Sequence, residues 1–188
     1  DAAAMDYSPV ETSPCVNTGA TGGPVPAADI AGLDRDARPD IGAHEFPIVP
    51  PRIFYVDRDN ASGVETGMEW NRAFADLEAA LSLSRTDDQV WIAAGTYVPT
   101  APSGREATFA IPADVAVYGH FAGSGTEETA VSDRDLLNGA FETVLSGDLD
   151  SSGGAPDLND AYHVLLLDRG VRLDGVTVTG GNATGGSG

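Results

Sequence analysis

The sequence predicts an all-β fold with a single amphipathic helix. Short runs rich in aliphatic and aromatic residues recur along the chain, and each is followed by Gly, Asp or Pro, which is typical of strands that end in turns. Helical periodicity occurs in one segment, residues 69–84. Because no helical segments lie between the later strands, the crossovers of an ordinary α/β sheet are missing. A β-sandwich and a parallel β-solenoid both fit this pattern.

The first part of the chain differs in composition from the rest. Residues 1–46 are rich in Gly, Pro, Ala and Asp with few large apolar side chains, so we expect no independent core there. Residues 47–52 contain three prolines, which favour extended backbone and predict a short stiff linker. A second segment should then span residues 53–188.

The second segment carries the predicted helix and strands. Residues 53–56 predict a strand, and the helix follows at 69–84 because Trp70, Phe74, Leu77 and Leu81 share one face. This helix should cover an apolar surface. Further strands are predicted at residues 89–93, 108–111, 115–118, 143–145, 162–167, 171–173 and 176–179.

Charge and hydropathy exclude two classes of function. The 188 residues include 29 acidic and 10 basic side chains, a net charge of -19, and every basic residue is Arg. Such a surface repels nucleic acid and lacks the basic footprint that phosphate binding needs. No apolar run approaches the roughly 18 residues that cross a bilayer. Cys15 is the only cysteine, so the chain can form no internal disulfide.

Two groups of aspartates are candidate metal ligands. Carboxylates interspersed with Gly and Ser supply the hard oxygen ligands that Ca²⁺ prefers, although neither loop matches the EF-hand pattern. Solvated acidic turns are the alternative interpretation. The candidate Ca²⁺ ligands are Asp34, Asp36 and Asp40 in one loop, and Asp148, Asp150, Asp157 and Asp160 in another.

Other chemistry is sparse. No Ser-His-Asp grouping, zinc-protease motif or phosphate loop is present, so we predict no catalytic residue. Trp70 and Trp91 are expected in a packed core beneath the helix, with sugar stacking as the alternative. Asn60-Ala-Ser62 and Asn182-Ala-Thr184 match the pattern of glycosylation sites.

Several segments carry a resemblance to a known family. They are Ile53-Phe-Tyr-Val-Asp57, Gly67-Met-Glu-Trp70, and residues 73–81, 90–97, 115–123, 143–148, 161–164 and 173–181. Together they resemble the opening of right-handed parallel β-helix repeat proteins of the bacterial cell surface. Residues 13–19 and 34–46 resemble the closing segment of that family, in which Ser-Pro precedes a motif like Asp40-Ile-Gly-Ala-His-Glu45.

The resemblance implies a fold and an order of modules. It implies a right-handed parallel β-helix whose first coil is covered by the helix at 69–84, because an uncovered solenoid end exposes unpaired strand edges. The closing segment at 1–46 precedes the linker and the opening segment at 53–188. This order predicts a junction between tandem modules or a subunit of permuted register.

The same resemblance implies a non-catalytic secreted or cell-surface module, such as an adhesin, stalk or filament subunit. Its expected partners are copies of itself, neighbouring β-helix modules or surface polysaccharide, and unfinished faces at 1–46 and 162–181 predict head-to-tail assembly. The alternative is a fragment of a β-helix polysaccharide lyase or glycoside hydrolase. The absence of Lys as a base and the few expected coils favour the structural module.

Overall fold

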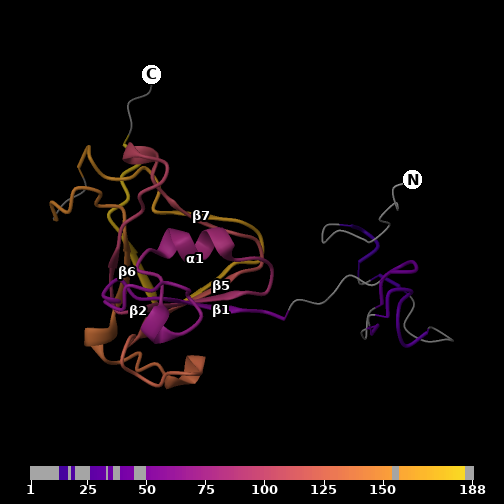
Figure 1. Ribbon diagram of the computed structural model, residues 1–188. Coiled ribbons are helices and arrows are strands. Elements are labelled where there is room, and N and C mark those ends of the chain that lie inside the picture. The colour runs from indigo at the N-terminus through magenta and orange to yellow at the C-terminus, as the bar shows by residue number, and fades with distance from the viewer. Residues whose placement is uncertain are drawn as a thin grey trace. The chain divides into compact units, whose positions relative to one another are not determined.

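The computed structural model describes residues 13–16, 18–19, 26–32, 34–35, 39–44, 50–153 and 157–184 (Figure 1). The chain divides into two compact units, Asp1–Pro50 and Pro51–Gly188. In the first unit, Ala28 and Asp34 form an isolated antiparallel bridge. The helices and the named strands all belong to the second unit.

In the described part of the second unit, nine strands form three small parallel sheets. The largest has the order β1-β2-β5-β8, the second β3-β6-β9, and the third β4-β7. The bounds are β1 Ile53–Val56, β2 Gln89–Ala93, β3 Gly95–Tyr97, β4 Phe109–Ile111, β5 Ala116–Phe121, β6 Thr143–Ser146, β7 Leu165–Leu167, β8 Arg172–Asp174 and β9 Val176–Thr179. Each later strand therefore adds to the same side of its sheet as the strands before it.

Short helical segments lie in the connections between these strands. The bounds are η1 Trp70–Arg72, α1 Leu77–Leu83, η2 Gly104–Glu106, η3 Val131–Asp133 and η4 Gly139–Phe141. Of the described residues, 12% are helical and 25% are in strands.

The predicted all-β, right-handed parallel β-helix solenoid is therefore wrong, and the fold is mixed. The strands are short and fall into three small sheets. They are separated by connections of unequal length, such as 98–108 and 122–142, which contain 3₁₀ turns. A three-residue helical turn has no periodicity that a sequence pattern could register.

The predicted helix at 69–84 is also wrong in extent. Trp70 lies in η1, and Phe74 forms a parallel bridge with Val56. α1 begins only at Leu77, because the Asp76 carboxylate accepts a hydrogen bond of 2.9 Å from the Glu78 amide and caps the helix. The segment 69–76 is thus not a continuous helix, despite its apolar spacing.

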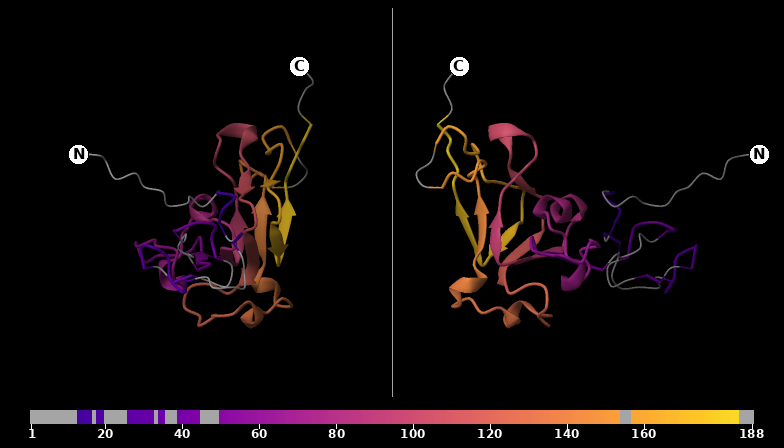
Figure 2. Two further views of the ribbon diagram at one scale, coloured as in Figure 1. Left: turned by 90° about the vertical axis from the view of Figure 1, so that its right-hand side faces the viewer. Right: turned by 60° about the vertical axis from the view of Figure 1, so that its left-hand side comes forward.

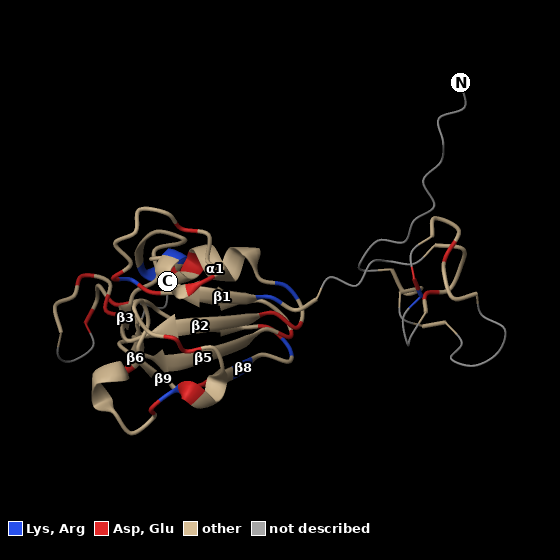
Figure 3. Cartoon of the chain, turned by 60° about the horizontal axis from the view of Figure 1, so that its bottom comes forward, with Lys and Arg blue, Asp and Glu red and all other residues tan. Residues whose placement is uncertain are grey.

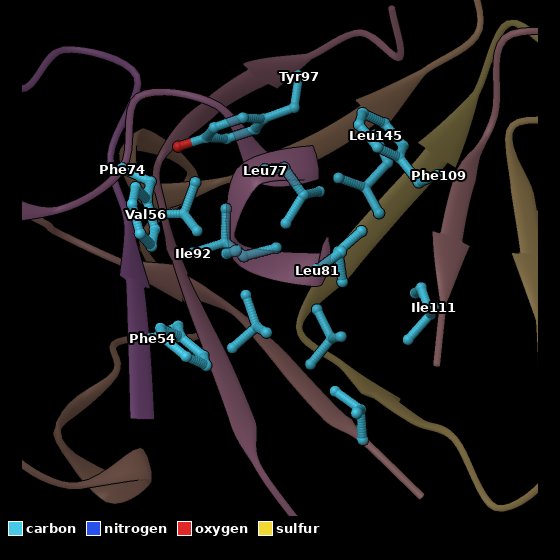
Figure 4. Close-up of a cluster of buried hydrophobic side chains, with 14 of the residues drawn as sticks. Phe54, Val56, Phe74, Leu77, Leu81, Ile92, Tyr97, Phe109, Ile111 and Leu145 are labelled. Atoms are coloured by element: carbon cyan, nitrogen blue, oxygen red, sulfur yellow. The ribbon is translucent and has the colours of Figure 1, made fainter. Parts of the chain in front are cut away.

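The main core lies between the three sheets and α1. Figure 4 shows Leu77 and Leu81 of α1 directed into a cluster that includes Val56, Ile92 and Leu145. α1 contacts β1, β2 and β4, the earlier strands of two of the sheets. The helix therefore covers one end of the core, and the expectation that it covers an apolar surface is confirmed.

A second core contains both tryptophans. Trp70 and Trp91 are 6% and 2% exposed, and they pack with Tyr55 and Phe121 in a cluster distinct from the one beneath α1. The rings of Trp91 and Phe121 are stacked, with centroids 4.6 Å apart. Burial of the tryptophans is confirmed, whereas their place beneath the helix is wrong. Such buried rings provide no sugar-stacking platform.

Candidate functional site

The first group of predicted calcium ligands lies in the first unit. Asp36 is outside the described residues. Asp34 is exposed, whereas Asp40 is buried. The Arg35 guanidinium donates hydrogen bonds to the backbone oxygens of Asp40 and Gly42, at 3.4 and 2.7 Å. These contacts give the loop a structural role that needs no metal.

The second group, Asp148, Asp150, Asp157 and Asp160, shares one loop that is stabilised from within. Both Asp148 and Asp150 accept a hydrogen bond of 3.0 Å from the Ser152 amide, and Asp160 accepts one of 2.7 Å from the Asp157 amide. The side-chain and backbone hydrogen bonds from Ser152 lower the pKa of Asp150. The carboxylates thus close turns of their own loop.

Within the described ranges, no group of three or more His, Cys, Asp or Glu residues is placed to hold a metal ion. The loop brings the four aspartates into one stretch of chain, but their oxygens face backbone amides. Calcium binding stays a prediction from the sequence.

A cavity of about 730 Å³ lies beside β3. Its lining includes Arg58, Asp76 and Asp148. Asp76 caps α1, Asp148 accepts hydrogen bonds from two amides of its loop, and the Arg58 guanidinium donates to the Thr96 carbonyl. A glycosidase needs two carboxylates that act on substrate, and both carboxylates named here hold the backbone instead.

The two glycosylation patterns also have structural roles. Asn182 is 8% exposed, and its side-chain nitrogen donates a hydrogen bond of 2.6 Å to the Asp157 carbonyl. The side-chain nitrogen of Asn60 donates one of 2.6 Å to the Ala73 carbonyl. These nitrogens are the atoms that would carry a glycan, and both already bond to backbone carbonyls of distant segments of the second unit.

A different feature emerges at the last strands of the sheets. Among the described residues, β7, β8 and β9 each pair with one strand only, and all three lie within residues 165–179. Figure 3 shows β8 and β9 at the far side of their sheets from α1, and the left view of Figure 2 shows a yellow strand at the margin of the sheets. We call β7, β8 and β9 the open edge.

The open edge leaves apolar side chains in water. Leu165, Val171, Leu173 and Val176 pack against the main core but are only partly buried. Leu166, Leu167 and Val178 are 62%, 48% and 47% exposed. An edge strand also presents unpaired N–H and C=O groups. The open edge therefore exposes both backbone groups and apolar surface that another chain could cover.

A smaller apolar cavity of about 370 Å³ lies across β4 and β7. It is lined by Ala110, Ile111, Pro112, Leu166, Leu167 and Asp168. Leu166 and Leu167 of this lining belong to the open edge.

The strand β8 is held firmly in place by charged groups. The guanidinium groups of Arg134 and Arg172 each donate to the Asp174 carboxylate at 3.1 Å, and each lies 5.3 Å from the ring centre of Tyr118. Burial opposes ionisation of Asp174, but the two arginines outweigh it and lower the pKa of this carboxyl. Gly175 then turns the chain into β9 with a φ of 71°.

The open edge differs in charge from the rest of the molecule. Residues 162–181 contain two acidic side chains, Asp168 and Asp174, and two basic ones, Arg169 and Arg172. Their charges cancel, in a chain whose net charge is -19. A second chain approaching this edge would therefore meet little local repulsion.

No protein-family model, curated protein or solved structure matches the chain. The resemblance to bacterial surface repeat proteins therefore stays a prediction. In the described part of the chain, no helix has the length and apolar character required to cross a membrane.

The sequence indicated part of this site. Residues 162–181, for which the resemblance implied an unfinished face, contain β7, β8 and β9, and the unfinished face itself stays a prediction. The link between Arg134 and Asp174 was missed, because residues that far apart in sequence carry no shared pattern.

Proposed function

We propose that this chain is a non-catalytic structural module of a secreted or cell-surface polypeptide, and that it joins a neighbouring copy or module through the open edge. The observation that carries this proposal is that, among the described residues, β7, β8 and β9 each pair with one strand only and leave Leu166, Leu167 and Val178 exposed. A protein that acts alone usually blocks such edges, because they template association.

The opposite end of the core supports the proposal by contrast. There, α1 buries Leu77, Ala80 and Leu81 against the core and contacts β1 and β4. The molecule thus covers one end of its core with its own helix, whereas apolar side chains stay accessible at the other. This difference favours a binding role for the open edge.

The extracellular setting is supported by composition and by the resemblance of residues 53–181 to surface proteins. A net charge of -19, with Arg as the only basic residue type, keeps a displayed protein soluble. Polysaccharide binding and a lyase or hydrolase activity have weaker support, because Asp76 and Asp148, the carboxylates named in the cavity beside β3, hold backbone amides.

Sedimentation velocity at rising protein concentration and physiological salt tests the proposal. We expect the wild-type chain to associate, and the double variant Leu166→Lys and Val178→Lys to remain monomeric, because both side chains lie exposed on the open edge. The matched control, Leu136→Lys with Leu137→Lys, changes two exposed leucines outside the edge and should associate like the wild type. A wild-type chain that is monomeric at every concentration would contradict the proposal.

A further inference from the structure

We propose that Asn138 is a site of spontaneous covalent modification, at which the Gly139 nitrogen attacks the side-chain amide and releases ammonia. The products are aspartate and isoaspartate at position 138. This inference is independent of the open edge and of the proposed function. It rests on the sequence pair, on the geometry of the turn η4, and on the contrast with asparagines whose side-chain nitrogens are held.

The residues around Asn138 leave the site open. Asn138 is the only asparagine of the chain that is followed by glycine. Glycine lacks a Cβ, so its backbone is freer than that of other residues and its nitrogen is not shielded by a side chain. A Cβ added at Gly139 would meet nothing within 4 Å, and Leu137, on the other side of Asn138, is 97% exposed. Water and hydroxide therefore reach the pair.

The turn holds the reacting atoms on one side of Asn138. Its Oδ1 accepts a hydrogen bond of 3.1 Å from the Ala140 amide, and the ring closed by this bond contains both the Asn138 Cγ and the Gly139 nitrogen. The Ala140 N–H also stabilises the negative charge that Oδ1 gains during the attack. In the described part of the chain, the Gly139 N–H donates to no acceptor, so no hydrogen bond has to break before the nitrogen reacts.

The leaving group of Asn138 is unrestrained, in contrast to that of two other asparagines. Asn60 and Asn182 make the same Oδ1 contact with the amide two residues ahead, at 3.0 Å in both cases. Their side-chain nitrogens, however, donate hydrogen bonds of 2.6 Å to the carbonyls of Ala73 and Asp157. Among the described residues, the side-chain nitrogen of Asn138 has no such acceptor, and it is not buried. It can therefore leave as ammonia without losing a protein contact.

The reaction needs only water and hydroxide. Hydroxide removes the proton of the Gly139 nitrogen, the bond between this nitrogen and the Asn138 Cγ forms, and the bond between Cγ and the side-chain nitrogen breaks. The departing nitrogen takes a proton from water and leaves as ammonia. Water then opens the five-membered imide, giving aspartate if the new bond breaks and isoaspartate if the original peptide bond breaks. Nothing is oxidised or reduced, and either product adds one negative charge to the -19 of the chain.

Isoaspartate would change the path of the backbone in the turn but not the start of β6. It inserts the former Cβ of residue 138 into the main chain, so the hydrogen bond of 2.9 Å from the Phe141 amide to the Asn138 carbonyl is lost. Thr143, the first residue of β6, is fully buried, and its hydroxyl donates to the Ala93 carbonyl at 3.0 Å. We expect the fold to persist while amide hydrogen exchange rises in residues 138–142.

Peptide mass spectrometry after incubation of the folded 188-residue chain at mildly alkaline pH tests the proposal. Asn138 should gain about 1 Da, the difference between the ammonia lost and the water gained, before any other described asparagine does. Gly139→Ala should slow this gain by about tenfold or more, because a side chain hinders the attack, and it should fold normally because the site is open. Hydroxylamine, which attacks the imide, should cleave the wild-type chain between residues 138 and 139 and leave Gly139→Ala intact. A folded chain that keeps the Asn138 amide would overturn the proposal.

The variant Ala61→Gly separates the geometry from the sequence pair. It changes an exposed residue and creates a second asparagine–glycine pair at Asn60, whose side-chain nitrogen is held by the Ala73 carbonyl. In the folded variant, Asn138 should react about tenfold faster than Asn60, because the departing nitrogen of Asn60 must first give up its hydrogen bond. In urea, where this bond is absent, the two rates should be similar. Equal rates of Asn60 and Asn138 in the folded variant would overturn the role assigned to the turn.

Discussion

The Asp88 carboxylate is 1% exposed and accepts hydrogen bonds from both the backbone amide and the guanidinium of Arg52, at 2.8 and 2.6 Å. Asp88 directly precedes β2 and Arg52 directly precedes β1. This ion pair therefore fixes the register at the start of the first two paired strands, where the second unit begins.

We expect Asp88→Asn to lower the free energy of unfolding by about 2 to 3 kcal/mol, because hydrogen bonds to a charged group are lost and Arg52 loses its partner. Asp87→Asn, at the exposed neighbouring position, should change it little. Urea unfolding of the two variants measures the difference, and equal stabilities would contradict the role of the ion pair.

The same ion pair predicts a dependence of stability on pH. Burial opposes the charged form of Asp88, but hydrogen bonds from Arg52 and Arg85 outweigh it and lower the pKa of the carboxyl. The folded-state pKa is thus below the unfolded value of about 3.9. The stabilisation is present above this value and is lost as pH falls through the lower folded-state pKa, since the unfolded chain then binds the proton more readily. As pH decreases through this acidic range, the free energy of unfolding should fall less steeply for Asp88→Asn than for the wild type. Urea unfolding at a series of pH values measures it.

Leu77 provides a test of the helix that covers the core. Leu77→Ala should destabilise the chain by about 3 kcal/mol, because a fully buried leucine is replaced by a cavity, and Leu77→Asp should have a larger effect. Arg72→Ala is the control, since its ion pair with Glu69 is exposed. Glu78→Ala should be destabilising, because Glu78 accepts hydrogen bonds from the amides of Thr100 and Ala101.

Calcium titration tests the metal prediction at Asp148, Asp150, Asp157 and Asp160. If the loop binds Ca²⁺, millimolar calcium should raise the midpoint of thermal unfolding, and EDTA should reverse the rise, because a ligand of the native state alone stabilises it. Asp150→Asn should remove the response, and Mg²⁺ should produce a smaller one. A midpoint that calcium leaves unchanged would exclude a structural site.

Asn182 should carry no glycan when the chain is secreted from cells that glycosylate. Its side-chain nitrogen donates a hydrogen bond to the Asp157 carbonyl, and its side-chain oxygen accepts a hydrogen bond from the Thr184 amide. Intact mass spectrometry checks this, and an added glycan mass at Asn182 would contradict it. Asn182→Ala should cost about 1 to 2 kcal/mol, whereas Asn159→Ala, at an exposed side chain of the same loop, should cost less.

The strands were more predictable from the sequence than the helix was. Residues 53–56 and 176–179 have the predicted bounds, because alternating β-branched and aromatic residues between turn formers specify extended chain locally. The predicted helix was too long because Trp70 and Phe74 match helical spacing by coincidence. Trp70 packs in the second core, and Phe74, which bridges to Val56 and lies outside α1, packs in the main core. Asp76 followed by Leu77 and Glu78 was the available signal for the true start.

The arrangement of the elements in space was less predictable from the sequence than the strands themselves. Gly95–Tyr97 was missed as a strand, since three residues carry little periodicity. The open edge depends on which strands pair, and the pairing of Val117 with Leu173 joins residues that no local pattern connects. Such contacts are decided by packing against the whole core, which a linear pattern does not contain.

The strand order also has a consequence for how the chain acquires its structure during synthesis. In every sheet the strands lie in the order in which a ribosome would release them, β1 before β2, β5 and β8, and β3 before β6 and β9. Each emerging strand therefore meets a finished neighbour and closes its contacts against an existing template, rather than waiting for a later segment. The second unit can thus grow vectorially from the end that contains β1 and α1, and its newest strands are always the ones that remain available for pairing.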